Sequence, residues 1–266
     1  MKFKFLFLLL FSCLSIMAQE TLTPIPVKQL SENSFTATRY LGTDALGCEY
    51  SITNNTFQKK QDGKTVKYKA VSLSTIYRAD LQNPLQIVLF YKKFNTVVLL
   101  DNQLNETARI NFSELQQPLL AEAVGLASQN RLWVYDTNTQ QVGLYDIINN
   151  TFKTLTPPFN QTLTDYQSNY NYFYWVDSLN NMYAVNLFGK VNTLGTLPEF
   201  EHLQLVNNKQ IILQKNNNLH LYNLENKSLQ KIDIAEKSFE NFNYSAQILS
   251  IFTKNKITHS KIILPE

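Results

Sequence analysis

Five charged residues recur at similar places along the sequence and could together bind a cation. Four stand 12 to 14 residues before equivalent points of a repeated pattern, and the fifth has the same place in its last copy: Arg78, Glu122, Asp165, Glu201 and Glu240. Hard cations such as calcium prefer carboxylate and carbonyl oxygens as ligands. If the repeats surround an axis, these side chains converge at one mouth of a channel. A calcium site and a merely solvated channel mouth both remain open.

The sequence has few other residue patterns that are typical of catalytic sites. The three histidines, His202, His220 and His259, do not have the spacing of a zinc site. No nucleophile elbow, phosphate loop or dinucleotide-binding glycine run occurs, and the 7 glycines of the chain leave few places for one. The sequence therefore predicts no catalytic residue and no metal ligand set, with calcium the one cofactor left open.

Tyrosines are concentrated in the segment DYQSNYNYFYW, residues 165–175. Aromatic side chains with polar tips are favoured at protein interfaces and sugar sites, so Tyr170, Tyr172 and Tyr174 are candidates for a recognition patch. Alternation along a strand would instead direct about half of such a run into the core. Both interpretations stay open.

Repeated apolar runs are the elements that must position these side chains. Lys92, Asp136, Asp177 and Lys215 each follow the first run of a unit and are spaced by 44, 41 and 38 residues. Each unit reads as strand, polar turn, strand, polar turn, strand, and the turns are rich in asparagine, which tolerates the left-handed conformation. A period near 40 with several short strands per unit is the signature of a β-propeller blade.

Weaker copies extend the repeat in both directions and bring the number of units to six. One blade leaves an apolar face uncovered until its neighbour packs on it, so only a closed ring buries all faces. The last unit ends near KIILPE, residues 261–266, and the early segment TPIPVKQL, residues 23–30, could pair with it. The prediction is an all-β, six-bladed β-propeller whose ring is closed by an N-terminal strand.

One unit, YWVDSLNNMYAVNLFGKV (residues 174–191), resembles the YWTD repeat of six-bladed propellers. The match covers Tyr174, Trp175, Asp177, Leu187 and Gly189, and NHL-type propellers share much the same outline. The resemblance implies a six-bladed ring. Calcium-dependent lactonases and phosphotriesterases are also six-bladed and place a metal near the channel mouth, which makes a hydrolase of that kind the alternative function.

The first residues, MKFKFLFLLLFSCLSIMAQE, have the features of a secretory signal peptide. Lys2 and Lys4 precede an apolar run that is too short to span a membrane, and Ala18 is a small residue at the expected cleavage point. Residues 1–18 are thus expected to be removed, leaving residues 19–266 as a single propeller domain. The alternative is a lipid anchor at Cys13, since LFSC partly resembles a lipobox.

Composition narrows the remaining function classes. With 24 basic and 21 acidic residues, the chain is close to neutral and offers no reason to expect nucleic-acid binding. Without Cys13 only Cys48 remains, so no internal disulfide can form and the core must hold the fold. We expect a secreted or periplasmic, outer-membrane-associated protein without a membrane span. It would bind an envelope protein or glycan and need no cofactor.

Overall fold

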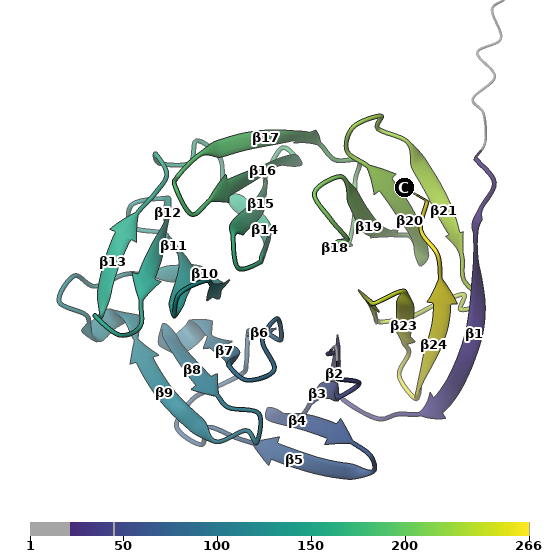
Figure 1. The fold of residues 1–266 in the computed structure, drawn as a ribbon, viewed down its shortest axis with the longest axis horizontal. Helices are drawn as coiled ribbons and strands as arrows, with labels where there is room; N and C mark the ends of the chain where they lie inside the picture. The colour runs from purple at the N-terminus through teal and green to yellow at the C-terminus, as the bar shows by residue number, and fades with distance from the viewer. Residues whose placement is uncertain (1–21, 45, 266) are drawn as a thin grey trace, which may run out of the picture.

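Strands make up the fold across residues 22–44 and 46–265, the part of the chain that the computed structural model describes. The expected signal peptide, residues 1–18, and the alternative lipid site at Cys13 lie outside these residues. Figure 1 shows the strands gathered into sheets that stand side by side around a central axis. The helical elements of the described part are two 3-10 turns, η1 (Lys92–Phe94) and η2 (Phe112–Glu114). None of its helices has the length and apolar character of a membrane span.

Four antiparallel sheets have four strands each, paired in sequence order. The first is β2 (Arg39–Thr43), β3 (Glu49–Thr53), β4 (Thr56–Gln61) and β5 (Lys64–Tyr68). The second is β6 (Arg78–Asp80), β7 (Ile87–Tyr91), β8 (Thr96–Leu100) and β9 (Glu106–Asn111). The third is β10 (Ala121–Ala127), β11 (Arg131–Asp136), β12 (Gln141–Asp146) and β13 (Thr151–Thr154). The fourth is β14 (Leu163–Ser168), β15 (Tyr172–Asp177), β16 (Asn181–Asn186) and β17 (Val191–Thr196).

An eight-stranded sheet contains the remaining strands in the order β18-β19-β20-β21-β1-β24-β23-β22. Its first part is β18 (His202–Leu205), β19 (Gln210–Lys215), β20 (Asn218–Asn223) and β21 (Leu229–Asp233). Its second part is β22 (Asn241–Ser245), β23 (Ile248–Phe252), β24 (Lys256–Ile262) and the N-terminal β1 (Ile25–Ser34).

The N-terminal strand β1 lies between β21 and β24. Two residues of β1, Ile25 and Pro26, pair in parallel with β21, and the rest of the strand runs antiparallel to β24 from Val27 to Ser34. The first and last parts of the described chain therefore meet in one sheet (Figure 1). Pro26 is tolerated because this part of β1 makes few ladder bonds.

Asparagine turns connect the strands as the sequence predicts. Positive φ values occur at Asn54, Asn55, Asn150, Asn180 and Asn217. Asparagine enters this left-handed region at little cost because its short side chain can bond to the nearby backbone. In the turn between β8 and β9 a leucine instead has the positive φ, Leu104 at 63°.

Apolar side chains pack between neighbouring sheets. Strands β7 and β8 are buried at every position. Alternate residues of β7 point to opposite sides, so Val88 and Phe90 pack against the third sheet while Leu89 and Tyr91 pack against the first. Each core cluster therefore needs two sheets, and a single sheet cannot bury its own faces.

Candidate functional site at the central cavity

A cavity of about 810 Å³ lies on the axis of the molecule. Its walls come from the first strand of each group of four, β2, β6, β10, β14, β18 and β22, and from the residues next to them. Figure 1 shows β6, β10, β14 and β18 nearest the axis, with β9, β13 and β17 at the periphery. We call the six wall strands the innermost strands.

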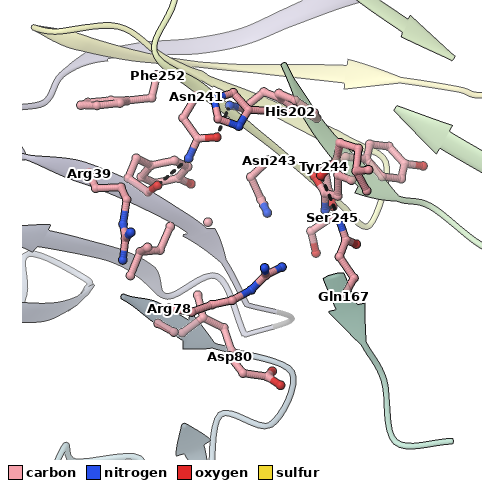
Figure 2. A pocket seen from close by; sticks show the side chains of 18 of the residues that line it. Arg39, Arg78, Asp80, Gln167, His202, Asn241, Asn243, Tyr244, Ser245 and Phe252 are labelled. Carbon is pink, nitrogen blue, oxygen red and sulfur yellow. Dashed lines mark hydrogen bonds between the residues drawn. The ribbon is translucent and has the colours of Figure 1, made fainter. Parts of the chain in front are cut away.

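Arg78 of β6 extends toward the middle of this cavity (Figure 2). Its Nη1 lies 3.5 Å from Oδ1 of Asp165 on β14, and its guanidinium carbon lies 4.0 Å from the ring centroid of Tyr166. Burial acts to lower the pKa of Arg78, but Tyr166, Asp165 and Asp80 outweigh it and the pKa is raised. Burial raises the pKa of Tyr166 to about 12. The site thus holds a permanent positive charge stacked on a neutral phenol.

Asp80 lies two residues after Arg78 and is held by backbone donors. Its Oδ2 accepts from the N–H of Leu126 at 2.7 Å, and its Oδ1 accepts from the N–H of Gln82 at 2.9 Å. Burial raises the pKa of Asp80, although the two backbone bonds and Arg78 act in the opposite direction. Glycine at position 125 leaves room mainly for the side chain of Ser168, which a Cβ there would overlap, and such a Cβ would also lie 3.3 Å from Oδ2 of Asp80.

Arg39 of β2 provides a second guanidinium to the cavity wall. Its Nη1 donates to the carbonyl of Tyr77 at 3.0 Å and its Nη2 to the carbonyl of Ile76 at 3.3 Å. Burial and the charge of Arg78 lower the pKa of Arg39. Among the described residues its buried Nε has no hydrogen-bond partner, and the same is true of Oδ1 of Asn243. Figure 2 shows Asn243 pointing into the cavity.

Amide side chains tie the innermost strands to one another. Gln167 of β14 donates to the carbonyl of Leu203 at 2.8 Å and accepts from the N–H of Leu205 at 2.9 Å. Gln204 of β18 makes the same pair of bonds to Tyr244 of β22, at 2.8 and 2.7 Å. Each side-chain amide thus forms hydrogen bonds with one N–H and one carbonyl on a strand edge that pairs with no other strand.

These ties continue around the whole axis. Asn241 of β22 donates to the carbonyl of Tyr40 on β2 at 2.8 Å. The hydroxyl of Tyr166 on β14 accepts from a backbone N–H of β10 at 3.2 Å. With Arg39 linking β2 to the segment before β6, and Asp80 linking β6 to β10, every innermost strand is tied to the next. Part of the polar cavity wall therefore joins neighbouring innermost strands, whereas Arg78 and Asn243 extend into the cavity (Figure 2).

Solved structures that are similar to this chain share one fold. The chain is similar to virginiamycin B lyase from Staphylococcus aureus, with a TM-score of 0.58 and 11% identity over 92% of this chain and 97% of that one. It is similar to a streptogramin B lyase, with a TM-score of 0.56 and 9% identity over 88% and 98% of the two chains. It is also similar to the β-propeller domain of Cps50 (Swd1) from Myceliophteria thermophila, with a TM-score of 0.57 and 9% identity over 88% and 100%. The fold is a β-propeller. No protein-family model and no curated protein matches the sequence.

Three of the five predicted charged residues line the propeller's cavity, namely Arg78, Asp165 and Glu240, whereas Glu122 and Glu201 do not. The arrangement also differs from a ring of acids, because Arg78 and Asp165 face each other. Among the described residues, no group of three or more His, Cys, Asp or Glu side chains is placed to hold a metal ion. The cavity therefore contains the charge pair of Arg78 and Asp165.

Two predicted acids are directed away from the cavity for local reasons. Glu122 lies at a register shift between Ala121 and Ala123, and its carboxylate pairs with Lys92 of the second sheet. Such a bulge re-aims the side chain of the extra residue. Glu201 precedes β18, and its Oε1 accepts from the N–H of Asn216 at 3.0 Å within its own sheet.

The three predicted tyrosines do not form one exposed patch. Tyr174 is 2% exposed and packs between the fourth sheet and β19, and its hydroxyl donates to Oδ1 of Asn208 at 2.7 Å. Tyr172 is half-buried beside it, whereas Tyr170 is 39% exposed at the turn before β15. Tyr172 and Tyr174 share the side of β15 that packs on the next sheet, whereas Tyr170 precedes the strand, so the candidate patch is reduced to Tyr170.

Sequence reasoning missed most of the polar cavity wall. The signal is a polar residue at every second position on or just after an innermost strand: Arg78, Asp80 and Gln82; Asp165 and Gln167; His202 and Gln204; Asn241, Asn243 and Ser245. A period of two places all members of such a set on one side of the strand. Recognising that side as the cavity requires knowing which strand of each sheet is innermost.

Proposed function

We propose that this chain is a non-enzymatic binding or scaffolding component of the cell envelope. In this proposal residues 1–18 are an export signal, and residues 19–266 form one six-bladed propeller closed by β1. Its partner is an envelope protein or glycan bound by the loops. The observation that carries the proposal is that Gln167, Gln204 and Asn241 of the cavity wall are bonded to backbone groups of neighbouring innermost strands, because side chains used in this way are not free to act on a substrate.

Exposed apolar side chains on the loops support a binding role. Phe188, in the turn between β16 and β17, and Val71, between β5 and β6, are both 92% exposed. Leu179 and Ile148 are also exposed on turns. Aromatic and apolar loop side chains of this kind supply anchors at protein interfaces.

Capture from the native envelope tests the proposal. The tagged protein is extracted under mild conditions and co-purifying molecules are identified, and we expect a stoichiometric protein or glycan partner. The variants Phe188→Ser and Val71→Ser are captured in parallel, and we expect one of them to lose the partner while the other serves as the matched control. Recovery of a clean monomer from wild-type cells would contradict a stable assembly.

The alternative is a calcium-dependent hydrolase of lactonase or phosphotriesterase type, and it makes an opposite prediction about metal. A calcium ion takes six to eight oxygen ligands, whereas Asp80 is bonded to backbone N–H groups and Asp165 faces Arg78. We therefore expect the melting temperature to be the same in calcium and in chelator, measured by scanning calorimetry. A rise of several degrees in calcium would favour the hydrolase, since a ligand that binds the folded state stabilises it.

A further inference from the structure

A row of polar side chains crosses the last strands of the propeller on one side of the sheet. Asn243 of β22 lies opposite Ser250 of β23, and Ser250 lies opposite His259 of β24. Ser250 is only 2% exposed. A polar row buried between sheets costs free energy unless its members find partners.

The partner of this row comes from the first sheet. Oγ of Ser250 lies 2.8 Å from Nδ1 of His259, and Nε2 of His259 lies 3.2 Å from Oε1 of Glu49 on β3. With Nε2–H donating to the carboxylate, Nδ1 is free to accept from the serine hydroxyl, so one tautomer satisfies the whole chain. The relay Ser250–His259–Glu49 thus joins residues 210 positions apart in the sequence.

Ser250 does not have the setting of a nucleophile, although serine, histidine and a carboxylate are aligned. It lies in the interior of β23, which is paired on both sides with β22 and β24. A hydrolytic serine needs an accessible Oγ and N–H donors left free for an oxyanion. The relay therefore has a structural role.

We propose that the relay Ser250–His259–Glu49 is an acid-sensitive latch that holds the last strands of the propeller against the first sheet. Next to it is a second cavity of about 410 Å³, lined by residues of the first sheet and by residues on and next to β22, β23 and β24. The latch therefore lies beside a gap between the first sheet and the last strands, and we call this junction the seam. The apolar cluster of Tyr40, Phe252 and Ile257 packs in the same seam. Loss of the relay opens the seam locally and leaves the other sheets intact.

The ionisation of Glu49 gives the direction of the pH effect. The hydrogen bond from His259 is the largest cause that holds the pKa of Glu49 below its ordinary value, and the charge of Lys60 acts in the same direction against burial. Because the folded-state pKa is lowered, the stabilisation is present above the ordinary pKa of about 4.5 and is lost as pH falls through the folded value. Other charged groups of the seam are Asp44 and Asp62 in the cavity wall and Lys261 further along β24.

Amide hydrogen exchange of the full chain, resolved by strand, tests the latch. At pH 7 we expect Glu49→Gln and His259→Leu each to speed exchange in β1, β23 and β24 by about tenfold, because a buried bond to a charged group is lost. Exchange in β15 and β16 should stay as in the wild type. The matched control is His220→Leu, which alters another strand histidine outside the seam.

Two further measurements complete the test. The double variant should exchange no faster than His259→Leu alone, since both substitutions break the same relay. From pH 6 to pH 4 seam exchange, corrected for the intrinsic pH dependence, should rise in the wild type and stay flat in Glu49→Gln. Equal acceleration in all sheets, additive effects, or labelling of Ser250 by a serine-reactive phosphonate would overturn the proposal.

Discussion

Deletion of residues 1–34, which removes β1, is expected to leave a protein that no longer folds cooperatively and that self-associates. The deletion frees the edges of both β21 and β24, because β1 is the strand paired with each of them. It also removes Ile25, which is buried in the cluster with Ile232 and Ile262. Unpaired edges pair with other chains. Size-exclusion chromatography and circular dichroism through a urea titration measure the effect.

The control for this deletion is a protein shortened only to residue 22, which keeps β1 and should unfold in a single transition. A synthetic peptide of residues 22–36 added to the long deletion should restore the transition, because the strand is then supplied in trans. If the protein without β1 unfolded at the same urea concentration as the control, the proposed closure of the ring would be wrong.

The repeating elements of this propeller were accessible from the sequence because each is determined locally. Short apolar runs such as Tyr172–Asp177 predict strands by their length and composition, and paired asparagines such as Asn54 and Asn55 predict turns by their tolerance of positive φ. Both signals need only a few neighbouring residues. The prediction of β-propeller architecture followed from the spacing of these signals along the chain.

The site was less predictable because it depends on register and on distant partners. Glu122 has the spacing of a cavity residue, but a bulge at this residue directs it toward Lys92. The pairing of Glu49 with His259 joins residues near the two ends of the chain. Nothing in the sequence around either residue indicates this contact. Spacing in sequence predicts which strand a residue belongs to, whereas its contacts depend on how adjacent sheets are packed.

Polar side chains join neighbouring sheets at two places in this propeller, along the innermost strands and at the seam. Innermost strands expose backbone donors and acceptors that have no neighbouring strand, and side chains such as Gln167 and Gln204 satisfy them. The seam is joined by a different device, a histidine between a serine and a carboxylate. Neutral amides do not titrate, whereas two junctions contain a carboxylate, Asp80 between β6 and β10 and Glu49 in the seam, so we expect acid to act on these two junctions.

Replacement of Trp133 by alanine is expected to cause the largest loss of stability of any single core substitution in the third sheet. The indole is fully buried, and its Nε1 donates to the carbonyl of Asn169 in the fourth sheet at 2.9 Å. Trp→Ala in a packed core costs about 3–5 kcal/mol through lost burial and the cavity left behind. The free energy of unfolding from a urea titration should fall by this amount, with the lone bond to Asn169 contributing about 1 kcal/mol.

The size of the stability loss shows how much the contact between the third and fourth sheets contributes to folding. Trp133→Phe keeps an aromatic ring beside Phe173 and Val185 but loses the indole N–H, so it should recover more than half of the loss. Tyr170→Ala, in the same turn as Asn169 but with a side chain that is 39% exposed, should change the free energy of unfolding by less than about 0.5 kcal/mol. A Trp133→Ala protein as stable as Tyr170→Ala would mean that the contact between the third and fourth sheets contributes little to folding.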